Sequence, residues 1–204
     1  MTMRLLTPFA LLVALGVGAF AASPVLPRPA KELEIVEPGG KHDLLTSYKG
    51  KVVVVQFLYT TCPHCQKYSQ LLTKIQADYG PKGFQALGAA FNEADNAMVS
   101  NYVLQNKVGF PVGPVGRDTV LSFLNLSIIE RFVVPQIVLI DKKGQIREQT
   151  EPNPSAAMPL QDETHLRASI EKLLAEGGAA KPGPGTGASN KAAPAPAPTK
   201  KPLS

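Results

Sequence analysis

Residues 52–65 read VVVVQFLYTTCPHC, and this stretch decides the fold. Its first seven residues are almost entirely apolar, with four consecutive valines and no polar alternation, which predicts a central strand buried on both faces. The only two cysteines of the chain, Cys62 and Cys65, follow this run closely. Apolar side chains then recur at spacings of three and four, which predicts a helix from Pro63 to Tyr79. Two thiols at the start of a helix can cycle between dithiol and disulfide, so the stretch indicates a redox enzyme.

The position of each residue in the Cys-Pro-His-Cys motif predicts its role. Cys62 stands at the first helical turn, where unpaired backbone N–H groups and the positive end of the helix dipole favour thiolate over thiol. Cys62 is therefore the predicted nucleophile, and Cys65, one turn further on, is predicted to resolve the mixed disulfide. Pro63 suits this turn because its missing N–H costs nothing there. His64 is predicted to donate a hydrogen bond or a charge to the Cys62 thiolate; the alternative is an exposed residue without a role.

Other uses of a cysteine pair fit the sequence less well. A structural zinc site usually needs four ligands, and the remaining histidines, His42 and His165, are remote in sequence, so no metal is expected. A static disulfide between Cys62 and Cys65 would close a short loop and restrain little of the chain. Haem attachment requires a histidine directly after the second cysteine, where this chain has Gln66. The expected redox centre is the cysteine pair itself, without a bound cofactor.

The remaining apolar patterns alternate between strands and helices. Strands are predicted at 32–36, 84–91, 110–115, 136–140 and 145–149, and helices at 92–108, 118–126 and 162–176. In the helix at 92–108, Met98, Tyr102 and Val103 share one face, and Asn92 or Asp95 is available as its N-cap. This order predicts an α/β sandwich with a central mixed sheet flanked by helices.

The two ends of the chain differ in composition from the rest. Arg4 followed by an uncharged apolar run predicts that residues 1–22 form an export signal peptide, with an uncleaved N-terminal anchor as the alternative. Either places the domain outside the cytoplasm, in the periplasm or a similar compartment, where disulfides persist. Composition defines three further segments: a Pro-rich spacer at 23–30, the folded domain at 31–176, and an Ala-, Pro-, Gly- and Lys-rich tail at 177–204 that is expected to be disordered.

The distribution of charge argues against nucleic-acid binding. The chain of 204 residues has a formal net charge of +5. All 16 Asp and Glu lie between residues 31 and 176, together with 15 of the 21 Lys and Arg, so this segment carries 15 − 16 = −1. The excess positive charge therefore lies in the terminal segments, and no basic cluster is expected on the domain. Nucleic acid is not an expected partner.

Taken together, these features resemble the thioredoxin fold, in which a strand, a CxxC motif and a helix are followed by a proline before a later strand, here Val134–Pro135. The run Tyr48–Phe57 is similar to the entry to the motif in the redoxin, or TlpA-like, branch, and Leu139–Gly144 resembles the hairpin of that branch. The resemblance covers Leu33–Glu176 and implies a thioredoxin-like sandwich. It also implies an exported protein-disulfide oxidoreductase of cell redox homeostasis. Its implied partners are cysteine-containing exported proteins and a membrane or periplasmic redox partner, and it is expected to be a monomer.

The resemblance also supplies a substrate-binding element. It implies a cis peptide bond between Val134 and Pro135 that faces the cysteines. The Val134 backbone would then pair with an extended substrate segment and hold the substrate disulfide in line with Cys62. The alternative is an ordinary trans proline at the start of a strand.

Three residues depart from the pattern of related sites. Thr61 stands where many relatives carry Trp before the first cysteine. Gln56 stands in place of a buried acid, and Tyr68 in place of a Glu after the second cysteine. Because both usual proton acceptors are absent, water, His64 or Tyr68 is left to accept the proton of Cys65; the alternative is slow resolution. The motif thus identifies the reaction better than its direction.

Two other families share parts of this pattern. Leu58–Pro63 resembles the approach to the metal cysteines of Sco-type copper chaperones, which would use His165 as the remote ligand. That family, however, spaces its cysteines by three residues. A peroxiredoxin-type peroxidase would need a Pro and a Thr where this chain has Val55 and Tyr59. Both alternatives fit the motif less well than exchange through its two cysteines.

Overall fold

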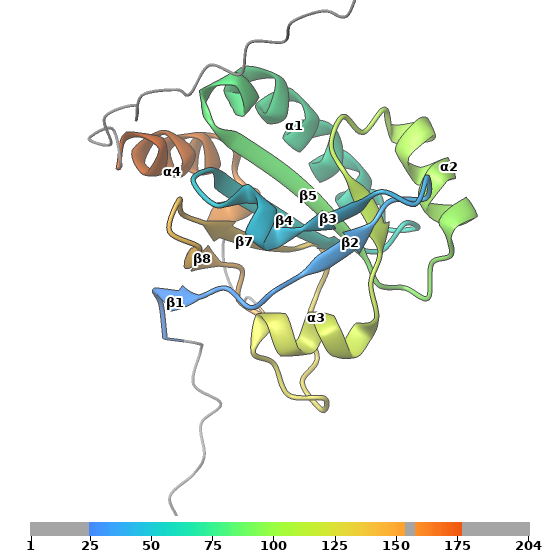
Figure 1. Cartoon of the computed structure of the whole chain (residues 1–204). Helices are drawn as coiled ribbons and strands as arrows, with labels where there is room; N and C mark the ends of the chain where they lie inside the picture. The colour runs from blue at the N-terminus through green and yellow to red at the C-terminus, as the bar shows by residue number, and fades with distance from the viewer. Residues whose placement is uncertain (1–24, 154–157, 177–204) are drawn as a thin grey trace, which may run out of the picture.

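The protein, seen in a computed structural model, is described over residues 25–153 and 158–176 and forms an α/β sandwich (Figure 1). The strands are β1 Arg28–Pro29, β2 Glu34–Val36, β3 His42–Leu44, β4 Val52–Leu58, β5 Phe84–Ala90, β6 Val112–Pro114, β7 Gln136–Ile140 and β8 Gln145–Gln149. The helices are α1 Pro63–Tyr79, α2 Asn96–Asn106, α3 Arg117–Leu124 and α4 Glu163–Ala175. The predictions for residues 1–22 and 177–204 lie outside the described residues.

Strand β4 lies inside a six-stranded sheet of order β1-β8-β7-β4-β5-β6, while β2 and β3 pair with each other. All seven residues of β4 are buried, as its uninterrupted apolar run predicts. It pairs in parallel with β5 and antiparallel with β7, so the predicted mixed sheet is confirmed. Because β4 and β7 are antiparallel, the residues that follow β4 lie beside those that precede β7. This register brings the CxxC motif to Val134–Pro135.

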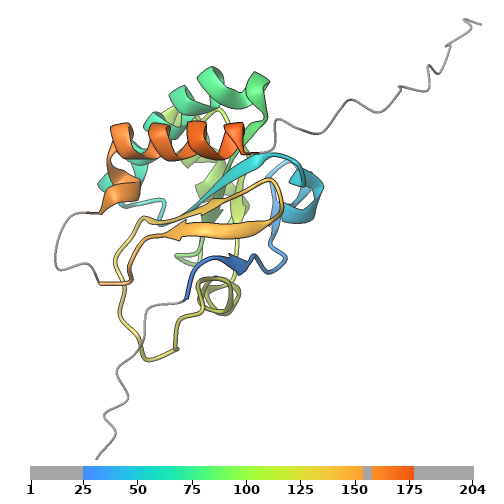
Figure 2. The same cartoon turned by 90° about the vertical axis from the view of Figure 1, so that its left-hand side faces the viewer.

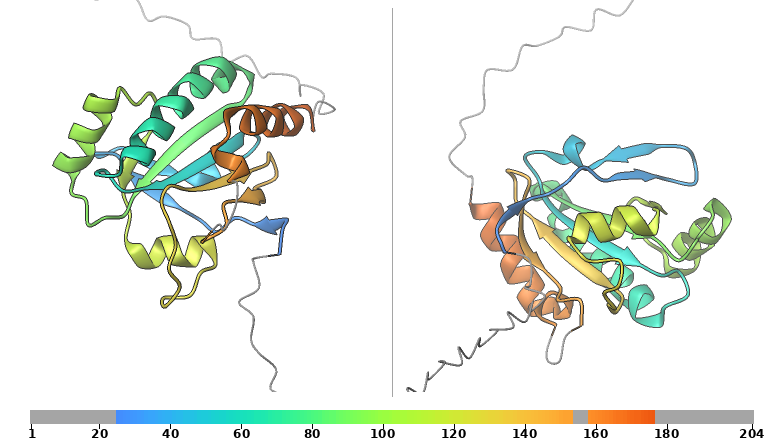
Figure 3. Two further views of the ribbon diagram at one scale, coloured as in Figure 1. Left: turned by 180° about the vertical axis from the view of Figure 1, so that it is seen from behind. Right: turned by 90° about the horizontal axis from the view of Figure 1, so that it is seen from below.

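Helices cover both faces of this sheet (Figures 2 and 3). On one face, α1 and α4 lie side by side, and their apolar residues pack with those of α2 in one buried cluster. On the other face, α3 packs with β2 and the opposite side chains of β4 in a second cluster. Burial of these two clusters is the main favourable contribution to folding, and it holds the site at one end of a rigid sheet.

Helix α1 has the bounds that the sequence predicts. Cys62 is its N-cap, with φ −85° and ψ 118°, and Pro63 occupies its first position. A short 3-10 turn, Gly80–Lys82, follows the helix, and Gly83 closes this turn with a φ of 98° that favours glycine. None of the helices in the described part of the chain is long and apolar enough to cross a membrane.

The helix expected at 92–108 is shorter than predicted. It begins at Asn96, and Asp95 caps it by accepting a hydrogen bond from the Met98 N–H. Asn92 is used elsewhere, because its amide bonds to both the backbone N–H and the hydroxyl of Thr60. Met98, predicted to face inward, is 38% exposed, and Val99 is buried in its place. The buried face consists of Val99, Tyr102 and Asn106, which recur at spacings of three and four, so Tyr102 is the one predicted residue that is fully buried.

The first strands of the chain depend on distant pairing. The predicted spacer at 23–30 contains β1, which pairs with β8. An Arg28 Nη2 atom donates to the Phe123 carbonyl at 2.8 Å and to Gln149 Oε1 at 2.7 Å. The sheet therefore begins ahead of residue 31. Strand β3, which has no signal in the sequence, forms by pairing with β2.

Candidate active site

The end of β4 and the start of α1 place the two thiols. Both cysteines are free; Cys62 is half-buried and Cys65 is fully buried. Cys62 Sγ accepts a hydrogen bond from the Cys65 backbone N–H at 3.4 Å, and the Cys62 N–H donates to the Tyr59 carbonyl at 3.1 Å. The outer thiol is thus the one that a substrate can reach, while the inner thiol lies one turn behind it.

The loop before β7 meets the outer thiol. The peptide bond between Val134 and Pro135 is cis, as the family resemblance implies. The Val134 carbonyl oxygen lies 3.9 Å from Cys62 Sγ, although 72 positions separate the two residues. Two side chains hold this loop: Gln161 Nε2 donates to the Pro135 carbonyl at 3.1 Å, and Gln136 Nε2 donates to the Val133 carbonyl at 2.8 Å. The predicted substrate-binding element is therefore in contact with the predicted nucleophile.

Burial sets the protonation of the inner thiol. Burial raises the pKa of Cys65 well above its ordinary value, the Tyr59 backbone N–H opposes this shift, and the neighbouring Cys62 thiol adds to it. Cys65 is therefore a neutral thiol at neutral pH in the dithiol protein. It must lose its proton before it can attack a disulfide.

A ring of buried polar groups lies behind Cys65. Gln56 Nε2 donates to the Cys65 carbonyl at 2.9 Å, and Gln56 Oε1 accepts from Ser69 Oγ at 2.7 Å. The Ser69 and Tyr102 hydroxyl oxygens are 2.6 Å apart, and the Tyr102 hydroxyl also lies 3.1 Å from the Cys65 carbonyl oxygen. Burial raises the pKa of Tyr102, so its hydroxyl stays protonated. The residue that replaces the expected acid is thus a hydrogen-bond donor to the resolving cysteine.

Tyr68 and Thr61, the other two departures from related sites, lie in different environments. Tyr68 is buried, and its hydroxyl donates to the Leu160 carbonyl at 2.7 Å. Burial raises the pKa of Tyr68, and its single proton is engaged away from the thiols. Of the three predicted proton acceptors, Tyr68 is therefore occupied by another contact. Thr61 is exposed beside Cys62, so the apolar platform of a Trp is replaced by a small polar surface.

Pro63 and His64 are both exposed at the start of α1. The His64 ring is exposed to solvent one residue after Pro63 and one before Cys65. His165, the remote ligand of the copper alternative, pairs through Nε2 with Glu148 Oε2 at 2.7 Å. Within residues 25–153 and 158–176, no group of three His, Cys, Asp or Glu side chains is placed to hold a metal ion.

An aromatic cluster that the sequence analysis missed connects the two sides of the site. The Tyr59 ring packs edge-on against Phe91 at 4.7 Å, and Phe91 stacks on Phe132 at 5.8 Å between centroids. The Arg117 guanidinium lies 5.3 Å from the centre of the Phe132 ring. Tyr59 precedes the CxxC motif and Phe132 precedes Val134, so the cluster braces the two loops against each other. The only sequence signal was an aromatic residue directly after β4 and after β5, Tyr59 and Phe91.

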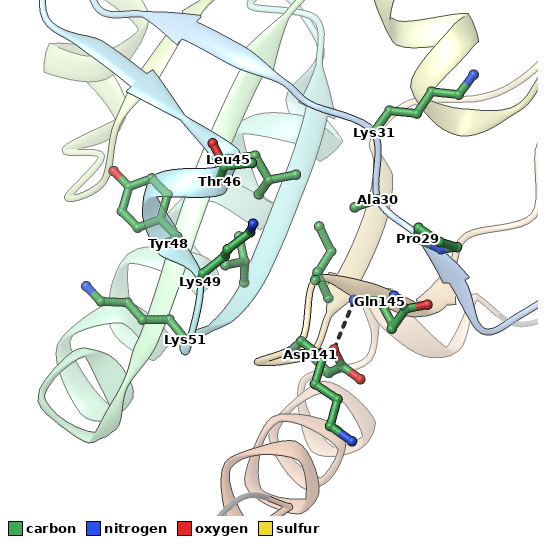
Figure 4. A pocket seen from close by; sticks show the side chains of 14 residues that line it. Pro29, Ala30, Lys31, Leu45, Thr46, Tyr48, Lys49, Lys51, Asp141 and Gln145 are labelled. Carbon is green, nitrogen blue, oxygen red and sulfur yellow. Dashed lines mark hydrogen bonds between the residues drawn. The ribbon is translucent and has the colours of Figure 1, made fainter. Parts of the chain in front are cut away.

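A pocket of about 220 Å³ lies at the far end of the sheet (Figure 4). Val53, near the start of β4, and Ile140, at the end of β7, line it, whereas Cys62 and Pro135 lie beyond the opposite ends of these strands. Its rim carries the lysines Lys31, Lys49, Lys51 and Lys143. The pocket is therefore separate from the thiols.

Thiol–disulfide exchange is the chemistry that two free thiols one helical turn apart support. The protein is therefore a thiol-disulfide oxidoreductase with a CxxC active-site pair. The chain belongs to the Redoxin family, whose model matches residues 26–165. The predicted family and enzyme class are confirmed.

Known relatives carry the same class in their names. The thiol-disulfide oxidoreductase ResA of Bacillus thuringiensis (strain Al Hakam) is 28% identical over 122 residues, which cover 60% of this chain and 67% of the relative. The ResA protein of Geobacillus thermodenitrificans (strain NG80-2) is 23% identical over 154 residues, which cover 72% of this chain and 85% of the relative.

Solved structures with the same architecture confirm the predicted thioredoxin-like sandwich. The thioredoxin domain of a thiol-disulfide oxidoreductase from Bacteroides vulgatus superposes with a TM-score of 0.60 at 21% identity, over 74% of this chain and 99% of that one. A thiol:disulfide interchange protein of the thioredoxin family from Chlorobium tepidum TLS gives a TM-score of 0.61 at 22% identity, over 74% and 99% of the two chains.

Proposed function

We propose that this protein exchanges disulfides with cysteine-containing polypeptides outside the cytoplasm, with Cys62 as nucleophile and Cys65 as resolving thiol. The approach of the Val134 carbonyl to within 3.9 Å of Cys62 Sγ carries the proposal. An extended substrate segment whose backbone N–H bonds to that carbonyl presents its sulfur directly to Cys62. Small disulfides need no such backbone partner, so this arrangement favours a polypeptide substrate.

Exchange proceeds in two balanced steps. The Cys62 thiolate first attacks one sulfur of a substrate disulfide, and the other substrate sulfur leaves as a thiolate and takes up a proton. Cys65 then loses its proton, to water or His64, and attacks the Cys62 sulfur. The Cys62–Cys65 bond forms as the remaining substrate sulfur departs. The substrate gains two electrons and the protein loses two; the reverse sequence donates a disulfide.

The residues between the thiols tune the nucleophile. Pro63 starts the helix and so directs its first N–H groups towards Cys62. His64 donates a hydrogen bond or a charge to the Cys62 thiolate. A more stable thiolate stabilises the dithiol protein and makes the disulfide more oxidising.

The amino-terminal sequence supports an extracytoplasmic, periplasmic location. Arg4 and the apolar run that follows it fit a signal peptide or an anchor, and the disulfides of client proteins persist outside the cytoplasm. Each turnover reduces or oxidises the Cys62–Cys65 pair by two electrons. A membrane or periplasmic redox partner must therefore restore the pair, and a monomer suffices for this cycle.

Replacement of the nucleophile tests the proposal. Reduction of insulin and oxidation of a reduced model protein are measured with the wild type, Cys62→Ser and Cys65→Ser. We expect Cys62→Ser to abolish both activities and Cys65→Ser to accumulate a mixed disulfide with the substrate, visible on non-reducing gels. Equal activity of the wild type and Cys62→Ser would refute the proposal.

A further inference from the structure

The polar ring behind Cys65 reaches the resolving cysteine from three elements. Gln56 comes from β4, Ser69 from α1 and Tyr102 from α2. Gln56 and Ser69 are fully buried and Tyr102 is 3% exposed. Because water does not reach these groups, each must find its hydrogen-bond partner inside the ring.

One arrangement of protons satisfies every group in the ring. Each hydroxyl carries a single proton, and Ser69 gives its own to Gln56 Oε1. Tyr102 is therefore the donor in its 2.6 Å contact with Ser69, and it shares this proton with the Cys65 carbonyl. The Gln56 amide must then turn its NH₂ group towards the Cys65 carbonyl. An ionised carboxylate at position 56 would have no proton to offer the Cys65 carbonyl, whereas the Gln56 amide offers one at any pH.

We propose that Gln56, Ser69 and Tyr102 are positioning residues for the resolving step, because they fix the Cys65 carbonyl and with it the Cys65 sulfur. The inference rests on the roles assigned to the two cysteines under the proposed function. The carbonyl is held from β4 and α2, outside its own helix, so the first turn of α1 cannot shift along the sheet. Reacting groups held close to attack geometry react faster than mobile ones.

The ring affects only the second step of the reaction, in which Cys65 resolves the mixed disulfide. After Cys62 has formed a mixed disulfide, the deprotonated Cys65 sulfur attacks the Cys62 sulfur. The Cys62–Cys65 bond forms, and the bond from Cys62 to the substrate sulfur breaks. The substrate sulfur leaves with the electron pair and takes up a proton. The first attack, by Cys62 on the incoming disulfide, does not involve Cys65 and is independent of the ring.

The two steps are separated with the full-length dithiol protein and the chromogenic disulfide dithiobis(nitrobenzoate). Attack by Cys62 releases one thionitrobenzoate in a bimolecular phase, and attack by Cys65 releases the second in a unimolecular phase. We expect Tyr102→Phe to slow the second phase about fivefold, the effect of one neutral hydrogen bond, and to leave the first unchanged. Tyr79→Phe is the matched control, because it removes a hydroxyl that bonds to Glu171 at the far end of α1.

Ser69→Ala provides a second variant, because it removes the centre of the ring without adding volume, and it is expected to slow the same phase. An unchanged or faster second phase in Tyr102→Phe and Ser69→Ala overturns the proposal, as does equal slowing of both phases. The roles of the cysteines are checked separately, since Cys65→Ser must release one thionitrobenzoate and Cys62→Ser must lack the fast phase. Failure of that check refutes the assignment under the proposed function, whatever the ring does.

Discussion

Cys62 and Cys65 have opposite environments although they lie one helical turn apart. Cys62 is half-buried beside an exposed Pro63 and His64, whereas Cys65 is 0% exposed and packed among apolar side chains. A substrate therefore meets Cys62 first, and Cys65 is shielded from direct reaction with solvent oxidants. The order of the two steps follows from burial.

His64 is expected to set the reduction potential. Replacing His64 by Ala removes a donor to the Cys62 thiolate, which destabilises the dithiol form and lowers the potential by roughly 30 mV, about 1.4 kcal/mol. Equilibration with glutathione buffers measures the shift. His42→Ala is the control, because His42 lies on β3 and pairs with Glu34. If the reduction potential of His64→Ala equals that of the wild type, His64 is an exposed residue without a role in the exchange.

For individual residues, the sequence predicts chemistry that depends on near neighbours better than contacts between distant residues. The roles predicted for Cys62, Cys65 and Pro63 depend only on neighbours within one helical turn, which the sequence shows directly. Pro135 is recognised through the family pattern alone. Tyr102 is predicted only as a buried helix residue, since its contact with the Cys65 carbonyl spans 37 positions and leaves no periodic signal.

Among the elements, β6 shows how closely backbones approach at the edge of the sheet. Gly113 on β6 faces the backbone of β2, and a Cβ atom there would press into the Val36 carbonyl and the Ile35 side chain. The glycine therefore allows the hairpin of β2 and β3 to lie against the sheet. A conventional side chain would push the two elements apart.

Gly113→Ala is expected to lower the free energy of unfolding by about 2–3 kcal/mol, since overpacking against backbone has little room to relax. Urea unfolding followed by circular dichroism measures the loss. Gly39→Ala serves as the matched control, because nothing lies within 4 Å of the added Cβ there. Equal stabilities of the two variants would show that β2 moves freely away from β6.

Some helices and strands can be predicted from local sequence patterns, whereas others form only through pairing with distant segments. Helix α1 is predicted with its bounds because Pro63 starts it and Gly80 and Gly83 follow it. Strands β1 and β3 are two and three residues long and exist through pairing with β8 and β2. Their residues carry no alternation long enough to indicate a strand.

In the whole molecule, the end of the sheet opposite the thiols is closed by a cluster of charges. Asp141 Oδ1 accepts from the backbone N–H groups of Lys143 and Gln145, each at 2.9 Å. Its Oδ2 accepts from Arg147 at 3.1 Å, and Arg147 also pairs with Glu176, after α4, at 2.7 Å. The hairpin of β7 and β8 is thereby joined to the last helix. Stability at this end should be separable from chemistry at the other.

Asp141→Asn tests this separation through pH. Burial alone would raise the pKa of the Asp141 carboxyl, but hydrogen bonds from Gln145, Arg147 and Lys143 hold it below its ordinary value. A lowered folded-state pKa contributes stability that is present above the unfolded value of about 3.9 and is lost as pH falls through the folded value. The variant should therefore be less stable than the wild type at neutral pH, by about 1 kcal/mol for a partly exposed pair, and the difference should shrink in acid.

Urea unfolding of both proteins at neutral and at strongly acidic pH measures the two differences. Glu93→Gln is the control, because Glu93 is exposed and makes no ion pair among the described residues. The two phases of thionitrobenzoate release should be the same in Asp141→Asn and the wild type, since the sheet separates Asp141 from the thiols. A stability difference that does not change with pH would show that ionisation of Asp141 does not contribute to the loss of stability in acid. Altered rates of thionitrobenzoate release would show that the two ends of the sheet are coupled.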